Sequence, residues 1–253
     1  MPALDDNRNP HHPARRSRFI LVVDNDEKNL AYLSRVLLRF NYQFLSAGSG
    51  EEAIELASII VPCLVIVSWN IPEITGPELI HRLSSNTATN HIPLVGLLTT
   101  ESAEDKRRCF DCGAIGYLCR PIDAETLYRT IQIAVEKNPR TGMRVRTIQP
   151  VRFEHGDTEG LRGAHTLDLS THGMFLRTTH LPSVHTQIGL QFDLSGRTIS
   201  TKAVVLYSCT HNEGPYREPG IGLRFLDIEP KDQEHIRQFI RADIMRGAGP
   251  AAS

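Results

Sequence analysis

The stretch "CLVIVSWNIPEITG", residues 63–76, sets the fold of the first half of the chain. Four of its first five residues are aliphatic, which is the pattern of a strand buried on both faces of a sheet. The apolar run ends at Ser68, and a loop containing Pro72 and Gly76 follows. The stretch therefore predicts a buried strand whose carboxyl end opens into a loop, the place where α/β proteins collect functional side chains.

Four more apolar runs lie on either side of this stretch and alternate with segments whose apolar residues have helical spacing. The runs span residues 19–23, 42–47, 93–98 and 115–119. Strands that alternate with helices predict an α/β domain with a doubly wound, parallel, five-stranded sheet over residues 19–138.

Four segments of this half resemble the response-regulator receiver family, whose members share the CheY-like fold. They read "ILVVDNDEKNL" (20–30), "PCLVIVSWNIPEITG" (62–76), "IPLVGLLT" (92–99) and "CGAIGYLCRPID" (112–123). The resemblance implies a site at the carboxyl ends of the strands. There, receiver domains hold Mg²⁺ with carboxylates and accept a phosphoryl group on an aspartate.

The positions that match this site depart from the family pattern. Asp24 keeps the first acidic position, but Asn25 stands at the second and Ser68 at the phosphoacceptor. Leu98 replaces the hydroxyl residue of the fourth strand, and Arg120 replaces the lysine of the fifth. A serine cannot form an acyl phosphate, and Mg²⁺ requires anionic oxygen ligands. The sequence predicts a degenerate receiver that is incompetent for phosphorylation and binds no metal.

The remaining acidic residues leave one question open at this edge. Asp24 and Asp26 are alternate residues at a strand end, where side chains point apart, and Arg120 offers a simpler partner for Asp24. We expect no metal here, but the sequence alone does not decide whether these two carboxylates hold a weakly bound cation.

In the second half of the chain the alternation of apolar runs with helical segments stops. Short alternating runs separated by turn residues predict an all-β, six-stranded barrel, and the segment 229–246 has helical spacing that predicts one C-terminal amphipathic helix. We expect this domain to span residues 139–246, with tails at 1–18, which we expect to be disordered, and at 247–253.

Two motifs in this half together resemble the PilZ family, whose members bind the bacterial second messenger cyclic di-GMP. Arg140 and Arg144 form RxxxR in the connector, and Asp168, Ser170 and Gly173 form DxSxxG in a turn between strands. RxxxR alone is a weak signal for the family, and the residues of DxSxxG are common in turns. The two motifs together, in this order, are a specific signal.

The chemistry of these residues suits a nucleotide with two phosphodiesters and two guanines. Arg140 and Arg144 can grip phosphate oxygens or stack on bases. Asp168 can accept from a guanine edge, and Ser170 can bridge ligand and turn. Gly173 would allow a positive φ and leave room for the ligand. The alternative is that Asp168 and Ser170 only close their turn, and that Arg140 and Arg144 are only solvent-exposed charges of a linker.

Composition excludes several classes of function. A net charge of −1 argues against a nucleic-acid partner, and the lack of a long apolar run argues against membrane insertion. The polar N-terminus has no signal-peptide pattern, so we expect a cytoplasmic protein. Five cysteines without an export signal argue against disulfides. Cys109 and Cys112 form CxxC within a predicted helix, where packing is the simpler interpretation than a metal or redox site.

The sequence therefore predicts a bacterial cyclic di-GMP effector that is not an enzyme. It would bind the messenger through its PilZ domain and signal by domain reorientation and contact with an unidentified protein, through its receiver or barrel surface. The alternatives are an adaptor with both sites inactive and a two-component response regulator with PilZ output. The partner, the pathway (motility, adhesion or polysaccharide secretion), the oligomeric state and the number of bound nucleotides stay open.

Overall fold

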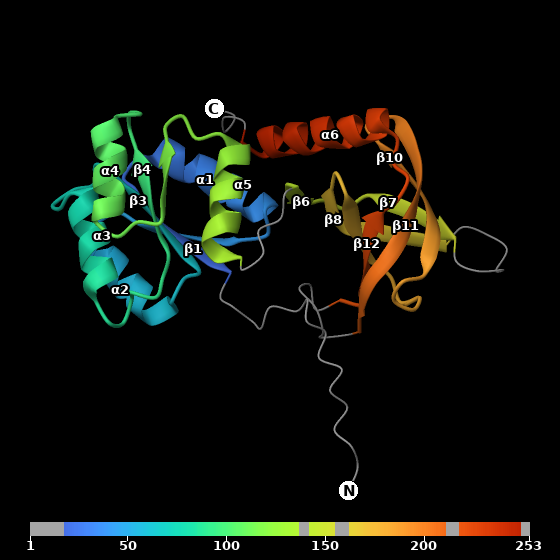
Figure 1. The fold of residues 1–253 in the computed structure, drawn as a ribbon, viewed down its shortest axis with the longest axis horizontal. Coiled ribbons are helices and arrows are strands. Elements are labelled where there is room, and N and C mark those ends of the chain that lie inside the picture. Colours follow the sequence, from blue (N-terminus) through green and yellow to red (C-terminus); the bar gives the residue numbers. More distant parts are fainter. Residues whose placement is uncertain (1–17, 137–141, 155–161, 211–217, 249–253) are drawn as a thin grey trace, which may run out of the picture.

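A computed structural model describes residues 18–136, 142–154, 162–210 and 218–248 of the chain (Figure 1). Its first half is an α/β domain in which five strands form one parallel sheet with the order β2-β1-β3-β4-β5. The strands are β1 (Phe19–Val23), β2 (Gln43–Ala47), β3 (Leu64–Ser68), β4 (Leu94–Leu98) and β5 (Gly116–Cys119). The helices are α1 (Glu27–Arg39), α2 (Gly50–Ile60), α3 (Gly76–Ser85), α4 (Ala103–Asp111) and α5 (Ala124–Val135). The expected doubly wound architecture is confirmed.

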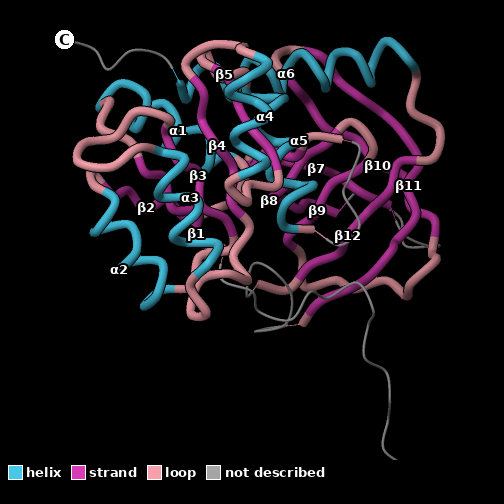
Figure 2. Tube along the Cα trace, turned by 60° about the vertical axis from the view of Figure 1, so that its left-hand side comes forward, coloured by secondary structure: helices cyan, strands magenta, loops and turns pink. Residues whose placement is uncertain are grey.

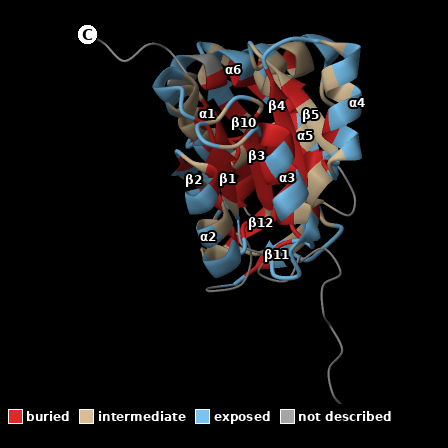
Figure 3. Ribbon diagram, turned by 90° about the vertical axis from the view of Figure 1, so that its left-hand side faces the viewer, coloured by how far each residue is buried: buried red, intermediate tan, exposed pale blue. Residues whose placement is uncertain are grey.

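Helices cover both faces of this sheet because alternate strand residues point to opposite sides. Ile20 and Val22 of β1 pack in one cluster with residues of α1 and α5. Leu21 and Val23 pack in a second cluster with residues of α2, α3 and α4. The buried residues concentrate on the strands, as Figure 3 shows.

Each of the five helices begins after a residue whose side chain accepts a backbone N–H of the first turn. These N-caps are Asp26, Ser49, Thr75, Ser102 and Asp123. Such caps satisfy N–H groups that have no partner inside the helix. They fix the strand-to-helix loops at the carboxyl edge of the sheet.

The second half is an antiparallel β-barrel domain, whose strands lie on the right-hand side of Figure 2. Its strands are β6 (Arg144–Arg146), β7 (Pro150–Glu154), β8 (Arg162–Ser170), β9 (Gly173–Arg177), β10 (Gln187–Leu194), β11 (Arg197–Cys209) and β12 (Gly220–Phe225). Strands β7 to β12 close into the expected six-stranded barrel through the β8–β9 pairing. The short β6 is an additional strand that pairs with the end of β8.

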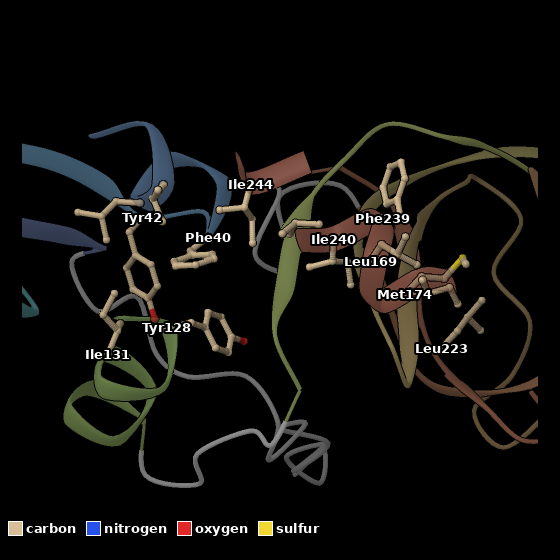
Figure 4. Close-up of a cluster of buried hydrophobic side chains, with 14 of the residues drawn as sticks. Phe40, Tyr42, Tyr128, Ile131, Leu169, Met174, Leu223, Phe239, Ile240 and Ile244 are labelled. Atoms are coloured by element: carbon tan, nitrogen blue, oxygen red, sulfur yellow. The ribbon is translucent and has the colours of Figure 1, made fainter. Parts of the chain in front are cut away.

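The C-terminal helix α6 (Pro230–Ala248) links the two domains. Figure 1 shows it extending from the barrel to the α/β domain. Its buried residues Ile236, Ile240 and Ile244 belong to a cluster that also contains Phe40 and Tyr128 of the α/β domain (Figure 4). The two domains therefore share one continuous apolar core.

Ion pairs flank this shared core. Arg39 of α1 lies 3.3 Å from Asp243 of α6, and Arg241 of α6 lies 2.9 Å from Glu125 of α5. The side chain of Asp243 is only 13% exposed, so its pair is shielded from water more than a surface pair would be. The apolar contact and the ion pairs hold the end of α6 against α1 and α5.

None of the helices in the described part of the chain is both long enough and apolar enough to cross a lipid bilayer.

Candidate functional site

The carboxyl edge of the parallel sheet brings together Asp24, Ser68 and Arg120, which follow or end β1, β3 and β5. The Arg120 Nη2 atom lies 2.6 Å from Asp24 Oδ2 and 3.3 Å from Ser68 Oγ. Asp24 is fully buried and also accepts from the backbone N–H of Asn25 at 2.9 Å and from the side-chain amide of Asn29. The expected pairing of Arg120 with Asp24 is present.

Asp26 also contacts this guanidinium, and here the sequence interpretation was wrong. Its Oδ2 atom lies 2.8 Å from Arg120 Nη1, so the two carboxylates converge on one cation and do not point apart. The reason is that Asp26 lies beyond the strand, as the N-cap of α1, where strand alternation no longer applies. The backbone N–H of Asn29, then that of Lys28 and the guanidinium of Arg120, lower the pKa of Asp26 below its ordinary value of 3.8.

The residues at this edge do not fit Mg²⁺. The carboxylate oxygens of Asp24 and Asp26 that a metal would need are engaged by Arg120. Asn25 is exposed and uncharged, and Ser68 offers a neutral hydroxyl. Leu98 is fully buried and has no group that could bond a phosphoryl oxygen. Within the described ranges, no group of three or more His, Cys, Asp and Glu side chains could hold a metal ion.

Of the CxxC pair, Cys109 lies in α4 and has the features of a packing residue, and Cys112 is the C-cap of the same helix. All five cysteines are free thiols, and Cys109 is buried beneath the sheet with its Sγ directed at the carbonyl of Gly116. Burial raises the pKa of Cys109 to about 11, so this thiol stays protonated at neutral pH and is a poor nucleophile and metal ligand.

A second constellation lies on the barrel, at the hairpin between β8 and β9. Ser170 is paired with Gly173, and its hydroxyl donates to the Gly173 carbonyl at 2.9 Å. The same hydroxyl accepts from the backbone N–H of His172 at 3.4 Å. Ser170 therefore holds the DxSxxG turn closed, and Asp168 lies two residues before it, half-buried on the same side of β8.

Strand pairing brings the second arginine of RxxxR to this turn. Arg144 begins β6, and its Cα partner across the ladder is Ser170. Because cross-strand partners project from the same face, the side chains of Arg144, Asp168 and Ser170 share the outer face of the barrel, where Ser170 is buried and the other two are partly exposed. Arg144 was expected in the connector between the domains, but it is the first residue of β6 and belongs to the sheet. Arg140 lies outside the described residues.

The chain just before β6 also lies against the turn. A side chain added at Gly142 would come within 2.9 Å of Nδ1 of His172 and 3.4 Å of Oγ1 of Thr171. The connector therefore approaches the DxSxxG turn closely before Arg144 is reached.

Gly173 has a different role from the one its motif position suggested. Its φ does not fall in the positive region, where Gly113 and Gly196 do. A Cβ at Gly173 would lie 2.1 Å from the carbonyl oxygen of Leu223 in β12. The glycine is required because the turn packs directly against the neighbouring backbone.

Helix α6 contacts the turn through Gln233. The side-chain amide of Gln233 donates to the carbonyl of Thr171 at 3.3 Å. Ten residues further along the same helix, a distance of about 15 Å at 1.5 Å per residue, Asp243 pairs with Arg39 of the α/β domain. Motif reading gave no signal for this connection, which depends on tertiary packing.

The comparisons with known sequences agree with both halves. Residues 20–132 match the sequence model of the response regulator receiver domain, and residues 136–242 match that of the PilZ domain. Protein PilH of Pseudomonas aeruginosa is 30% identical over 112 residues, which are 44% of this chain and 93% of PilH.

Two further relatives have a lower sequence identity to this chain than PilH has. A Vibrio cholerae protein named "Probable cyclic di-GMP phosphodiesterase" is 29% identical over 149 residues, 59% of this chain and 32% of that protein, so this chain spans about a third of its length. The solved structure of chemotaxis protein CheY4 of Vibrio cholerae is 28% identical, with a TM-score of 0.44, over 46% of this chain and 97% of that one.

The matched ranges contain the two constellations described above, with the Asp24–Arg120 edge in the first range and the Asp168–Gly173 turn in the second. The chain therefore belongs to the response-regulator receiver family through its first half and to the PilZ family through its second, as a fusion of the two domains.

Proposed function

We propose that the protein is a cyclic di-GMP effector. It binds the messenger on the outer face of its barrel and signals to a protein partner by domain reorientation, without phosphorylation of its receiver domain. PilZ and receiver domains fit a cyclic di-GMP effector that acts by binding and not by catalysis.

One observation carries the binding part of the proposal. The β6–β8 register gathers Arg144, Asp168 and Ser170 on one outer face. A guanidinium supplies paired donors for phosphate oxygens, and a carboxylate can accept from the N1–H and N2–H₂ edge of guanine. These are the two groups that a cyclic diguanylate presents.

The independence from phosphorylation rests on the sheet edge of the receiver domain. Arg120 forms ion pairs with Asp24 and Asp26, so the site already contains a fixed positive charge where a receiver would bind a metal. Ser68 is 4% exposed, and its hydroxyl accepts from the same guanidinium, which does not activate it as a nucleophile.

The route of the signal is inferred from α6. Gln233 near the start of this helix contacts the ligand turn, and Arg241 and Asp243 near its end contact the α/β domain. A ligand that changes the turn, or that draws the connector onto it, would shift α6 and thereby alter how the receiver packs on the barrel. A different receiver surface would then face the partner.

Equilibrium dialysis with labelled cyclic di-GMP tests the proposal. We expect the full-length chain to bind, Asp168→Ala to bind roughly 10- to 150-fold more weakly because a charged hydrogen bond contributes roughly 1.5–3 kcal/mol, and cyclic di-AMP to compete poorly. Prior incubation with acetyl phosphate and Mg²⁺ should leave no labile adduct and the same affinity. An adduct, or an affinity that depends on acetyl phosphate, would contradict independence from phosphorylation.

Small-angle scattering tests the reorientation separately. The profile should change when the protein is saturated with ligand. Superimposable profiles at saturation would exclude reorientation and leave a binding protein that signals by its surface alone.

A further inference from the structure

Two arginines outside both motifs lie on the face that carries the DxSxxG turn. Arg146, the last residue of β6, has Asp168 as its Cα partner on β8. Arg224 of β12 has Gly173 as its partner on β9. Both arginines are exposed.

The registers order these residues in two adjacent rows across the barrel. The first row runs through Arg144, Ser170, Gly173 and Arg224, on β6, β8, β9 and β12. The second row begins at Arg146 and Asp168 and continues to Phe175. Since residues in register project from one face, arginines flank the turn on both of its sides.

Gly173 allows the arginines on the two sides of the turn to lie close together. Its missing side chain allows β9 to pack on the backbone of β12 at Leu223, and it leaves the first row empty between Ser170 and Arg224. The strands are about 4.8 Å apart, so three strand spacings, or about 14 Å, separate the backbones of β6 and β12. A nucleotide on the turn would therefore lie between the two sets of arginines.

The arginines on this face differ from most others in the fold. Many described arginines pair with a carboxylate within 4.0 Å, as Arg177 and Arg197 do. Within the described part of the chain, neither Arg146 nor Arg224 has such a pair, although Asp168 and Glu218 belong to the same domain. Guanidinium groups that are exposed and without an ion pair are available to a ligand.

We propose that Arg146 and Arg224 are additional phosphate-binding residues of this site, one on each side of the DxSxxG turn. The inference rests on the proposed function and extends it. A cyclic dinucleotide has two phosphodiester groups on opposite sides of its ring, and a site with arginines on two sides matches this distribution of charge. The ligand spans four strands, with Arg144 and Arg146 on one side and Arg224 on the other.

Calorimetric titration of the chain of residues 1–253 with cyclic di-GMP tests the assignment. Arg146→Ala and Arg224→Ala should each weaken binding about 10-fold or more, as loss of a charge-assisted phosphate contact does. Each variant should also show a smaller dependence of affinity on salt concentration than the wild type. Arg146→Lys and Arg224→Lys should recover part of the affinity, because the charge remains while the planar fork is lost.

Arg152→Ala is the matched control. Arg152 is exposed on β7 and pairs in register with Gly163 and Gln191, away from the turn, so its loss should change the affinity less than twofold. Thermal unfolding of all variants should match the wild type, since the substituted side chains are exposed.

The outcomes separate the two proposals. If the wild type and Arg152→Ala bind while Arg146→Ala or Arg224→Ala matches them, the two-sided site is wrong and the proposed function stands. If the wild type does not bind cyclic di-GMP, the proposed function fails and this inference fails with it.

Discussion

Arg120 and Asp24 form an ion pair of 2.6 Å at the carboxyl edge of the parallel sheet, and the Asp24 carboxylate is fully buried. The guanidinium reaches on to Asp26 and to Ser68. The receiver fold is thus retained with the guanidinium of Arg120 in the position between the carboxylates. Its N-caps and the aliphatic residues of its strands are residues other than Ser68, so this fold does not require an aspartate at position 68.

Removal of the Arg120 guanidinium should destabilise the α/β domain. Arg120→Ala leaves Asp24 buried without its charged partner, which typically costs about 3–5 kcal/mol when a buried pair is broken. Chemical denaturation should report a loss of this order in the free energy of unfolding. Arg82→Ala, which removes an exposed pair with Glu78 on α3, is the control and should cost less than about 1 kcal/mol. Equal losses in the two variants would show that Arg120 is only a surface charge.

Acid should remove stability that Asp26 contributes. The folded state depresses the pKa of Asp26 below 3.8, chiefly through the backbone N–H of Asn29. The contribution is therefore fully present above the ordinary value and is lost as the pH falls through the lower folded value. Asp26→Asn keeps a capping oxygen but does not titrate. The difference in unfolding free energy between wild type and variant should be larger at pH 6 than at pH 3, and a constant difference would contradict the assignment.

Gly173→Ala should destabilise the barrel because its Cβ would collide with the Leu223 carbonyl. Overpacking of this kind lowers the free energy of unfolding by roughly 1–3 kcal/mol. The thermal unfolding midpoint of the variant without ligand should therefore be lower than that of the wild type. Gly163→Ala in β8 is the matched control, because a Cβ there meets nothing within 4 Å. Similar midpoints for the two variants would show that the turn can move away from β12.

The interface at the end of α6 should open when a charge is placed in it. Ile244 is 1% exposed and belongs to the cluster that includes Phe40. Ile244→Asp should increase the radius of gyration in scattering while both domains stay folded by circular dichroism. Ile133→Asp on α5, where the isoleucine is 64% exposed, should leave the radius unchanged. An unchanged radius for Ile244→Asp would mean that the domains are held together elsewhere.

Local patterns were sufficient to predict most of the fold. Asp123 accepts from the N–H of Thr126 at 2.8 Å as the N-cap of α5, and Gly113 adopts a φ of 104° just after the C-cap of α4. Such features depend on a few neighbouring residues, so the sequence contains them. The same holds for the DxSxxG turn, in which Ser170 bonds within its own hairpin.

Features that depend on long-range packing could not be read in advance. Asp26 and Arg120 are 94 positions apart, and their contact arises only when β1 and β5 join one sheet edge. The alignment of Arg146 and Arg224 with the turn follows from strand register, which no spacing in the sequence specifies. The apolar stripe of α6 predicted a buried face, but not that Ile244 at its end would meet a second domain.

Binding of cyclic di-GMP to the barrel is tested most directly by calorimetric titration of the nucleotide into the wild-type chain beside Arg144→Ala. The wild type should bind saturably and the variant roughly 10- to 150-fold more weakly, with the fold of both intact. Equal affinities in the two proteins, or no binding by the wild type, would contradict this prediction.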